Sequence, residues 1–264
     1  MWRNELGKRE RYAPGAFCWV ELETTDLAGS SRFYGELFGW DASETGSDAS
    51  IEFRLDGALV CGMRALSPRL RHEGVPPHWN AFVSVQSVDW MLGAARAFDG
   101  HVVADGYENS DRARRGFIKD PTGAVLGLWE PRTHHGAERV NDPGCFVWSE
   151  LHTPDVDRAT GFLREFFGWD IRPQQGNPGM PYQIVRNGDW LNAGLLPLGP
   201  EEGDAPPHWL TFFTVASCDA TSARATELGG QVLGGPRDVS IGRIVVLGDP
   251  AGAVFALFEG ETDD

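Results

Sequence analysis

The stretch GAFCWVELETTDLAGSSRFYGELFGWD at residues 15–41 returns as GCFVWSELHTPDVDRATGFLREFFGWD at residues 144–170, with 13 of 27 positions identical. Two later pairs keep nearly the same spacing: PPHW at residues 76 and 206, and DPTGAVLGLWE at residue 120 against DPAGAVFALFE at residue 249. Two copies at an offset of 129 or 130 residues indicate two domains of one design. The chemistry is therefore expected where the copies agree or where they differ.

The repeat also sets the predicted domain boundaries. Each copy is long enough to bury a hydrophobic core of its own. We expect, in chain order, a polar N-terminal extension at 1–14, a first domain at 15–130, a linker rich in Pro, Gly and charge at 131–143, a second domain at 144–259 and an acidic tail at 260–264.

Both copies predict the same order of elements. An opening strand leads through a capping aspartate to an amphipathic helix that a glycine ends. Hairpins follow, and a second strand-helix unit and a closing strand after a D-P-x-G turn complete the half. Each half is thus predicted as β-α-β-β-β repeated twice, an α+β domain with helices packed on one side of a curved sheet. The signals are strands at Phe17–Thr24 and Phe146–Thr153, caps at Asp26 and Asp155, helix ends at Gly39 and Gly168, and turns at Asp56-Gly57 and Asn187-Gly188.

Period-2 alternation divides each opening strand into two rows of side chains. One row is small and mostly apolar, as in Cys18, Val20, Leu22 and Thr24, and suits packing under the helices. The other row mixes aromatic and ionisable residues, which suits the wall of a ligand cavity because a buried unpaired carboxylate is costly in a core. A solvated face is the alternative for its glutamates. This row is Phe17, Trp19, Glu21 and Glu23 in the first domain and Phe146, Trp148, Glu150 and His152 in the second.

The same alternation extends the predicted cavity wall over two more strands of each domain. The wall is aromatic with a small residue at its centre, which leaves room for a flat ligand and faces on which it can stack. Its further members are Asn80, Phe82, Ser84, Val125, Gly127 and Trp129 in the first domain and Leu210, Phe212, Thr214, Val254, Ala256 and Phe258 in the second.

The order of strand, D-x-x-x-(S/A)-x-x-F helix, F-G-W and D-P-x-G closing strand resembles the vicinal oxygen chelate superfamily. This is the group of glyoxalases, bleomycin-resistance proteins and extradiol dioxygenases, and the resemblance spans Gly15 to Glu259. The F-x-W-x-E-L-x-T-x-D opening is similar to a tandem branch among actinobacterial glyoxalase-like proteins. The resemblance implies two open cups of eight strands each. It also implies that enzymes of the group hold a divalent metal with two histidines and a glutamate.

The residues at the family's ligand positions argue against that metal. The first histidine position holds Trp19 and Trp148, the second Asn80 and Leu210, and the glutamate position Gly127 and Ala256. These side chains cannot hold Mn, Fe, Ni or Zn, so we expect no metal and no cofactor. A displaced metal site built from Glu21, Glu23, Glu150 and His152 is an alternative. The histidines of the PPHW motifs, His78 and His208, are expected to be loop or packing residues, and His134 and His135 fall in the linker.

Two functions fit this set of residues. The first is a metal-independent acid-base enzyme of dehydratase, cyclase or isomerase type, acting on an aromatic or polyketide-like molecule in natural-product metabolism, a substrate class that the resemblance implies. The second is a non-catalytic drug-binding protein of bleomycin-resistance type, and a metal-dependent glyoxalase-like or dioxygenase-like enzyme is a further alternative. A binding protein needs no titrating group, so the change from Glu23 to His152 favours the enzyme. The catalytic candidates are Glu150, His152, Glu21 and Glu23, and the ligand-binding candidates are Trp19, Trp148, Asn80, Phe82, Phe212, Trp129 and Phe258.

The charge and cysteine patterns limit the partners and the compartment. The chain has 23 basic and 38 acidic residues, and its formal charge of −15 repels nucleic acid and anionic membranes. We expect a planar or aromatic small-molecule ligand and a monomer or homodimer. The four cysteines show no C-x-x-C spacing, which predicts buried thiols. The N-terminus carries no apolar run, so we expect a cytoplasmic protein.

Overall fold

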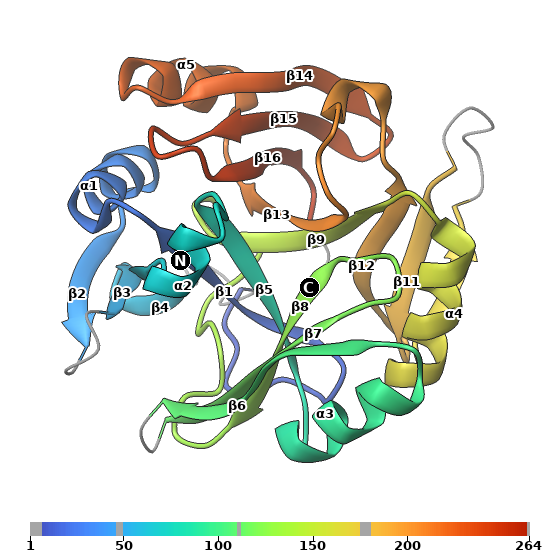
Figure 1. Ribbon diagram of the computed structural model, residues 1–264. Helices are drawn as coiled ribbons and strands as arrows, with labels where there is room; N and C mark the ends of the chain where they lie inside the picture. The colour runs from blue at the N-terminus through green and yellow to red at the C-terminus, as the bar shows by residue number, and fades with distance from the viewer. Residues whose placement is uncertain (1–6, 46–49, 110–111, 175–180, 263–264) are drawn as a thin grey trace.

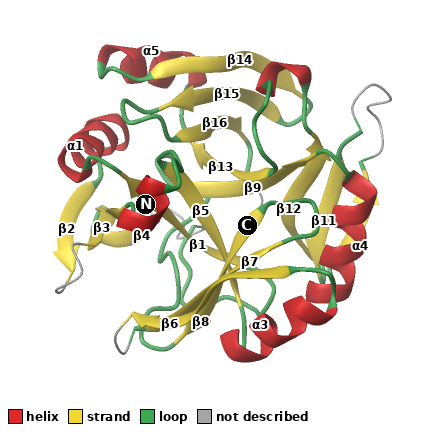
Figure 2. Cartoon of the chain, in the orientation of Figure 1, coloured by secondary structure: helices red, strands yellow, loops and turns green. Residues whose placement is uncertain are grey.

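The computed structural model describes residues 7–45, 50–109, 112–174 and 181–262, and for 105–109 the backbone only. Residues 1–6 of the predicted extension and 263–264 of the predicted acidic tail lie outside these ranges. The chain forms two eight-stranded open sheets, one for each repeat, with the helices on the outside (Figure 1, Figure 2). The predicted α+β class and the two tandem cups are confirmed.

The first sheet and its helices occupy the first copy of the repeat. Its elements are β1 Phe17–Thr24, α1 Leu27–Phe38, β2 Asp41–Thr45, β3 Ser50–Leu55, β4 Ala58–Ala65, α2 Pro68–His72, β5 His78–Ser84, α3 Val88–Ala97, β6 His101–Asn109, β7 Ala113–Lys119 and β8 Val125–Pro131. The second copy folds in the same order. Its elements are β9 Phe146–Thr153, α4 Val156–Phe167, β10 Asp170–Pro173, β11 Gln183–Asn187, β12 Trp190–Pro197, the 3-10 turn η1 Pro200–Glu202, β13 His208–Thr214, α5 Cys218–Glu227, β14 Gln231–Val239, β15 Gly242–Gly248 and β16 Val254–Gly260.

Each sheet consists of two modules in which the fourth strand returns to lie beside the first. In the first sheet β1 pairs in parallel with β4 and antiparallel with β5, and β5 pairs in parallel with β8. In the second sheet β9, β12, β13 and β16 repeat these pairings. The opening strands β1 and β9 are therefore central. We call the face that carries Trp19, Glu21 and Glu23, or Trp148, Glu150 and His152, the inner face of each cup.

The local signals for the first helix of each domain are confirmed. Asp26 accepts a hydrogen bond from the backbone N–H of Gly29 at 2.9 Å, and Asp155 makes the equivalent bond at the start of α4. Gly39 and Gly168 end these helices with left-handed φ angles of 74° and 72°. Helix α2 and the turn η1 were not predicted because each is too short to show a helical period.

A β-bulge at Cys18 and at Val147 breaks the alternation of the opening strands. One extra residue in a strand reverses the direction of the side chains before it. Phe17 therefore packs between the domains, with its ring centroid 5.2 Å from that of Trp209, and Phe146 joins the main core. The prediction that Phe17 and Phe146 line the cups is wrong for this reason.

The tryptophans of the two F-G-W motifs connect the domains. Trp40 Nε1 donates to the carbonyl of Gly144 at 2.7 Å, and Trp169 Nε1 donates to the carbonyl of Gly15 at 2.9 Å. Both indoles are buried, and the glycines have φ angles of 82° and 86°, which favour glycine over other residues. The repeat therefore opens with glycine and ends with tryptophan because these residues meet across the interface.

The first helix of each domain packs on the other domain. Helix α1 lies beside α5, where Arg224 donates to Glu36 at 2.8 Å, and α4 lies beside α3 in the same way (Figure 1). Tyr34 of α1 donates at 3.1 Å to Asp249, the aspartate of the second D-P-x-G turn. One apolar core runs through both domains as a result.

The four cysteines are free and buried, as their spacing predicts. Burial raises the pKa of the Cys18 and Cys61 thiols well above the usual range, so both stay protonated. Within the described ranges, the helices are too short or too polar to cross a membrane.

We predict that the interface tryptophans stabilise the whole chain. Trp40→Phe removes the side-chain donor of the buried Gly144 carbonyl, which costs about 1–3 kcal/mol of unfolding free energy. Trp169→Phe costs less, because Asn192 Nδ2 still donates to the Gly15 carbonyl at 3.0 Å. Trp90, whose side chain is 67% exposed, is the matched control, and Trp90→Phe changes stability by less than about 0.5 kcal/mol. Urea unfolding followed by tryptophan fluorescence and circular dichroism measures both. Equal stability of the three variants would contradict the role of these bonds.

Candidate active site

The inner face of the first cup is filled by its own aromatic side chains. Trp19, Phe82 and Trp129 are all buried, and the rings of Trp19 and Trp129 lie 5.9 Å apart. The ring of Phe82 packs directly against Gly127. A Cβ at this position would lie only 2.3 Å from the nearest ring atom, so a larger residue would clash. The aromatic candidates of this cup therefore pack on one another.

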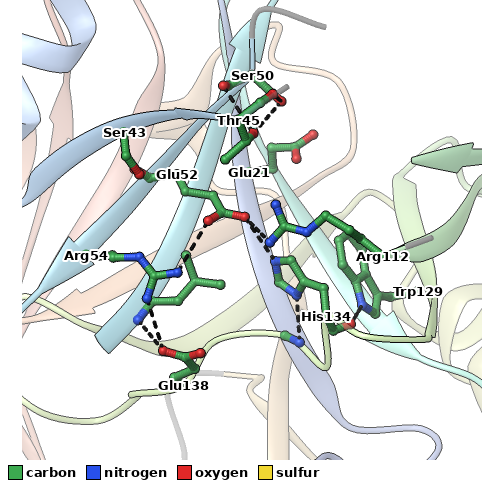
Figure 3. A network of polar contacts seen from close by, with 12 residues as sticks. Glu21, Ser43, Thr45, Ser50, Glu52, Arg54, Arg112, Trp129, His134 and Glu138 are labelled. Carbon is green, nitrogen blue, oxygen red and sulfur yellow. Dashed lines mark hydrogen bonds and ion pairs between the residues drawn. The ribbon is translucent and has the colours of Figure 1, made fainter. Parts of the chain in front are cut away.

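Ion pairs occupy the polar part of the same face. Glu21 accepts two hydrogen bonds from Arg115, at 2.9 and 3.0 Å, and lies 2.8 Å from Arg64. Glu52 of β3 pairs with Arg54 and Arg112, and its Oε1 lies 3.9 Å from Nε2 of His134 (Figure 3). Arg115 is 1% exposed and lies over the Trp129 ring at 5.8 Å. The carboxylate of Glu21 is thus neutralised inside the protein rather than presented to a ligand.

His134 of the linker closes this cup. Its ring meets those of Trp19 and Trp129 edge-on at 4.6 and 4.8 Å, and its carbonyl accepts from Trp129 Nε1 at 3.0 Å (Figure 3). Burial, with the nearby charges of Arg112 and Arg115, lowers the pKa of His134 to about 3. A neutral imidazole therefore lies between two indoles where a ligand of the first cup would bind.

We predict that His134 makes the protein sensitive to acid. The folded protein holds this imidazole neutral down to a pKa of about 3, whereas the unfolded chain protonates it near its ordinary value of 6.5. The unfolded state then binds more protons between these values, and stability falls as the pH falls through them. From pH 7 to pH 4.5 this group alone removes about 2 kcal/mol of unfolding free energy.

The measurement compares urea unfolding at the two pH values in three proteins. His134→Gln loses less stability on acidification than wild type by about 2 kcal/mol, because it has no imidazole to protonate. His135→Gln, next in the chain, keeps the wild-type difference. The same acid-induced loss in all three proteins would show that His134 is not the sensitive group.

A hollow of about 760 Å³ lies at the first cup, between the N-terminal extension, the linker and the polar part of the inner face. Half of its lining residues are charged, and Arg54 and Arg112 are held in ion pairs with Glu138 and Glu52. Ion-paired side chains of this kind suit a polar ligand better than a planar apolar molecule. We therefore look to the second cup for the ligand site.

The inner face of the second cup is apolar where the first is charged. Leu210, Phe212, Ala256 and Phe258 form a cluster of their own, apart from the main core, and Val147, Trp148, Ile244 and Val246 pack around it. The strand register explains the change. Ile244 is the ladder partner of Phe258 at the place where Arg115 pairs with Trp129 in the first cup. In the same way, Leu196 pairs with His152 where Arg64 pairs with Glu23 in the first cup. Where the first cup places arginines, the second places aliphatic side chains.

A hydrogen-bonded chain borders this apolar cluster. The indole N–H of Trp148 donates to the hydroxyl of Tyr182 at 3.0 Å, and Tyr182 donates to Glu150 Oε1 at 2.5 Å. Gly194 makes room for this contact, since a Cβ there would lie 1.9 Å from the tyrosine oxygen. Burial and the charge of Glu150 raise the pKa of Tyr182 well above its usual range, so the phenol stays protonated and donates.

His152 continues the chain on the other side of Glu150. Its Nε2 lies 3.5 Å from Glu150 Oε2, and its Nδ1 lies 2.7 Å from Glu202 Oε1. Burial alone would lower the pKa of His152, but the hydrogen bonds and charges of Glu150 and Glu202 outweigh it and raise the pKa to about 9. His208 stacks on His152 at a centroid distance of 5.0 Å. The imidazole is therefore held in its protonated form at neutral pH.

The structure brings together some of the predicted residues and adds others. Glu150 and His152 meet as expected, whereas Glu21 and Glu23 are buried in the other cup. Tyr182 and Glu202 were missed, because they lie outside the segments that repeat. His208 was expected to be a loop or packing residue, but it is the first residue of β13 and pairs directly with His152.

The family's metal positions do not fit a metal in either cup. In the second cup Trp148 is engaged with Tyr182, and Leu210 and Ala256 belong to the apolar cluster. In the first cup Trp19 and Gly127 offer no ligand atom for a metal, which leaves Asn80 as a lone amide. We derive no catalytic step through a metal at these positions.

Comparison with known proteins agrees with this fold. The profile of a family described as glyoxalase-like domain matches residues 148–258. CFP32 of Mycobacterium tuberculosis, named as a candidate glyoxylase, is 35% identical over 259 residues, covering 96% of this chain and 98% of its own. The anthracycline biosynthesis protein DauV of Streptomyces sp. strain C5 is 34% identical, with 94% of each chain covered. The Mn(II)-bound glyoxalase of Novosphingobium aromaticivorans superposes with a TM-score of 0.66 at 17% identity, covering 95% of this chain and 84% of its own.

The fold and the repeat thus define a protein of the glyoxalase-like class with two cups. The chain belongs to the vicinal oxygen chelate superfamily, as a tandem member whose copies both lack the usual metal ligands. Proteins of this fold bind small molecules.

Proposed function

We propose that the protein is an acid-base enzyme that acts, without a metal at the family position, on an aromatic or polyketide-like small molecule in natural-product metabolism. The observation that carries the proposal is the chain of Tyr182, Glu150 and His152 beside an apolar wall in the second cup. The relatives named for anthracycline biosynthesis, DauV and the Streptomyces peucetius protein DnrV, support the substrate class.

Glu150 is the group proposed to exchange protons with the substrate. Its carboxylate accepts a hydrogen bond from Tyr182 on Oε1, and its Oε2 lies 3.5 Å from the imidazolium of His152. A carboxylate held in this way can take a proton from carbon next to a carbonyl, and the imidazolium behind it can supply one in return. Such proton transfers suffice for a dehydration, an isomerisation or an aldol-type ring closure.

The apolar cluster is proposed to bind the rings of the substrate. Trp148 and Phe258 provide aromatic side chains, and Ala256 keeps the centre of the cluster small. A planar ligand on this surface would lie next to Glu150, because Trp148 and Glu150 point to the same face of β9.

We predict that turnover depends on the second cup alone. Glu150→Gln and His152→Ala lower kcat by about 10² or more, and Tyr182→Phe by about 10-fold, because each removes a group that acts in proton transfer. Glu23→Gln, the first-cup counterpart of His152, is the matched control and leaves kcat within about twofold. The assay follows candidate aromatic polyketides by mass and retention time, since an isomerisation changes only the second, and is run in chelator. Loss of turnover in Glu23→Gln but not in Glu150→Gln would place the chemistry in the other cup.

A binding protein without catalysis is the second candidate, favoured by the size of the apolar cluster around Trp148. Sequestration of a planar drug needs stacking surfaces and no proton transfer. The two functions then differ in which residue matters most.

We predict that Trp148→Ala weakens binding of a planar ligand by about 1 kcal/mol or more, a fivefold or greater rise in Kd, through lost stacking. Calorimetric titration measures it, with Trp190→Ala, a tryptophan that is 69% exposed, as the control. If Trp148→Ala binds as wild type does, the cluster is not the ligand surface. Tight binding with no change of ligand mass or retention time, together with wild-type affinity in Glu150→Gln, would favour the binding protein over the enzyme.

A further inference from the structure

Three potential metal ligands meet at one end of the polar chain in the second cup. His152 of β9, Glu202 of the turn η1 and His208 of β13 each offer one ligand atom, and these atoms lie within 4.8 Å of one another. His152 and His208 are direct partners across the β9–β13 ladder. The sheet itself therefore fixes two of the three residues.

The separations suit a metal ion. Nδ1 of His152 lies 2.7 Å from Glu202 Oε1, and Nε2 of His208 lies 3.7 Å from the same oxygen. Ligand atoms around a tetrahedral ion with bonds of about 2.1 Å are about 3.4 Å apart. Small movements of the Glu202 side chain, which lies on a turn, would bring its oxygen to this spacing from both histidines. The two ring nitrogens lie within 4.8 Å of each other, so small side-chain rotations of the histidines complete the geometry.

Each of the three side chains also has a second polar partner outside the cluster. His208 Nδ1 lies 2.9 Å from the carbonyl of Pro206, which can only accept, so the proton is on Nδ1 and the lone pair of Nε2 points at the cluster. Glu202 Oε2 accepts from the N–H of Gly199 at 2.6 Å, which leaves Oε1 for the cluster. His152 Nε2 faces the carboxylate of Glu150 at 3.5 Å. Outer partners of this kind orient metal-binding histidines and carboxylates in proteins.

We propose that His152, Glu202 and His208 form a binding site for a borderline divalent cation such as Zn²⁺, displaced along the strands from the position used in the family. Two imidazoles and one carboxylate suit Zn²⁺ better than Mg²⁺ or Ca²⁺, which prefer oxygen. Three protein ligands leave one coordination position open. Of the four residues first considered for a displaced site, His152 alone belongs to it.

The site goes beyond the proposed function and does not rest on it. A metal bound to Nδ1 of His152 uses the lone pair that otherwise binds a proton. The proton transfer proposed above therefore applies to the metal-free, chelator-treated protein. Binding is therefore measured on the protein without substrate, and its result is separate from turnover.

The first cup contains the matched control. His78 occupies the position of His208 and makes the same Nδ1 contact, at 2.8 Å to the carbonyl of Pro76. Its partner across the ladder is Glu23 in place of His152. A histidine in the same local setting but outside the cluster tests whether the three residues act together.

The experiment titrates chelator-treated, buffer-exchanged protein with ZnCl₂ by calorimetry, with MgCl₂ as the control ion. Wild type and His78→Gln are expected to bind about one Zn²⁺ per chain and no Mg²⁺. His208→Gln and Glu202→Gln lose a ligand and are expected to bind at least about 100-fold more weakly, and Glu150→Gln about 10- to 100-fold more weakly through His152.

Two ligand variants on different elements keep the test open if one of them fails to fold, which circular dichroism would reveal. Wild-type protein that takes up no Zn²⁺ would overturn the proposal. So would Zn²⁺ uptake that is unchanged in His208→Gln and Glu202→Gln, because the ion would then be bound elsewhere.

Discussion

The pair of hydrogen bonds from Trp40 to Gly144 and from Trp169 to Gly15 constrains everything else in the structure. Each bond ties the end of the first helix in one domain to the start of the central strand in the other. The inner-face residues lie on these central strands, so their positions depend on the interface as well as on their own sheet. The shared core confirms that neither domain is packed independently of the other.

The two cups share a fold, but their inner faces differ in polarity. The first cup closes on itself, because Arg115 neutralises Glu21 and His134 fills the space between two indoles. A buried arginine is expensive unless its carboxylate partner is present, so these residues are coupled. The second cup has Ile244 in place of Arg115, and an uncharged side chain needs no counter-charge at that position. Its one carboxylate on β9, Glu150, is instead held by a phenol and an imidazole.

The fold could be predicted from the sequence far better than the site. The repeat, the capping aspartates and the glycine helix ends are local signals, and each acts in the structure as the sequence predicts. The β-bulges at Cys18 and Val147 could not be predicted, because an inserted backbone residue leaves no mark in an alternating pattern. The role of His134 could not be predicted for another reason. A charged, proline-containing segment is typical of an exposed linker, whereas the burial of the His134 side chain depends on two tryptophans that are distant in the sequence.

The polar cluster of the second cup follows from the geometry of strands β9 and β13. Side chains two or four residues apart on a strand point the same way, so Trp148, Glu150 and His152 share one surface. Trp148 and Leu210 occupy the ligand positions that the resemblance assigns to these two strands, and other polar groups lie farther along the same strands. His152 and His208 lie there, and their register makes them neighbours without any change of backbone. The same β9–β13 ladder that carries the positions of the family's histidines therefore also brings His152 and His208 together.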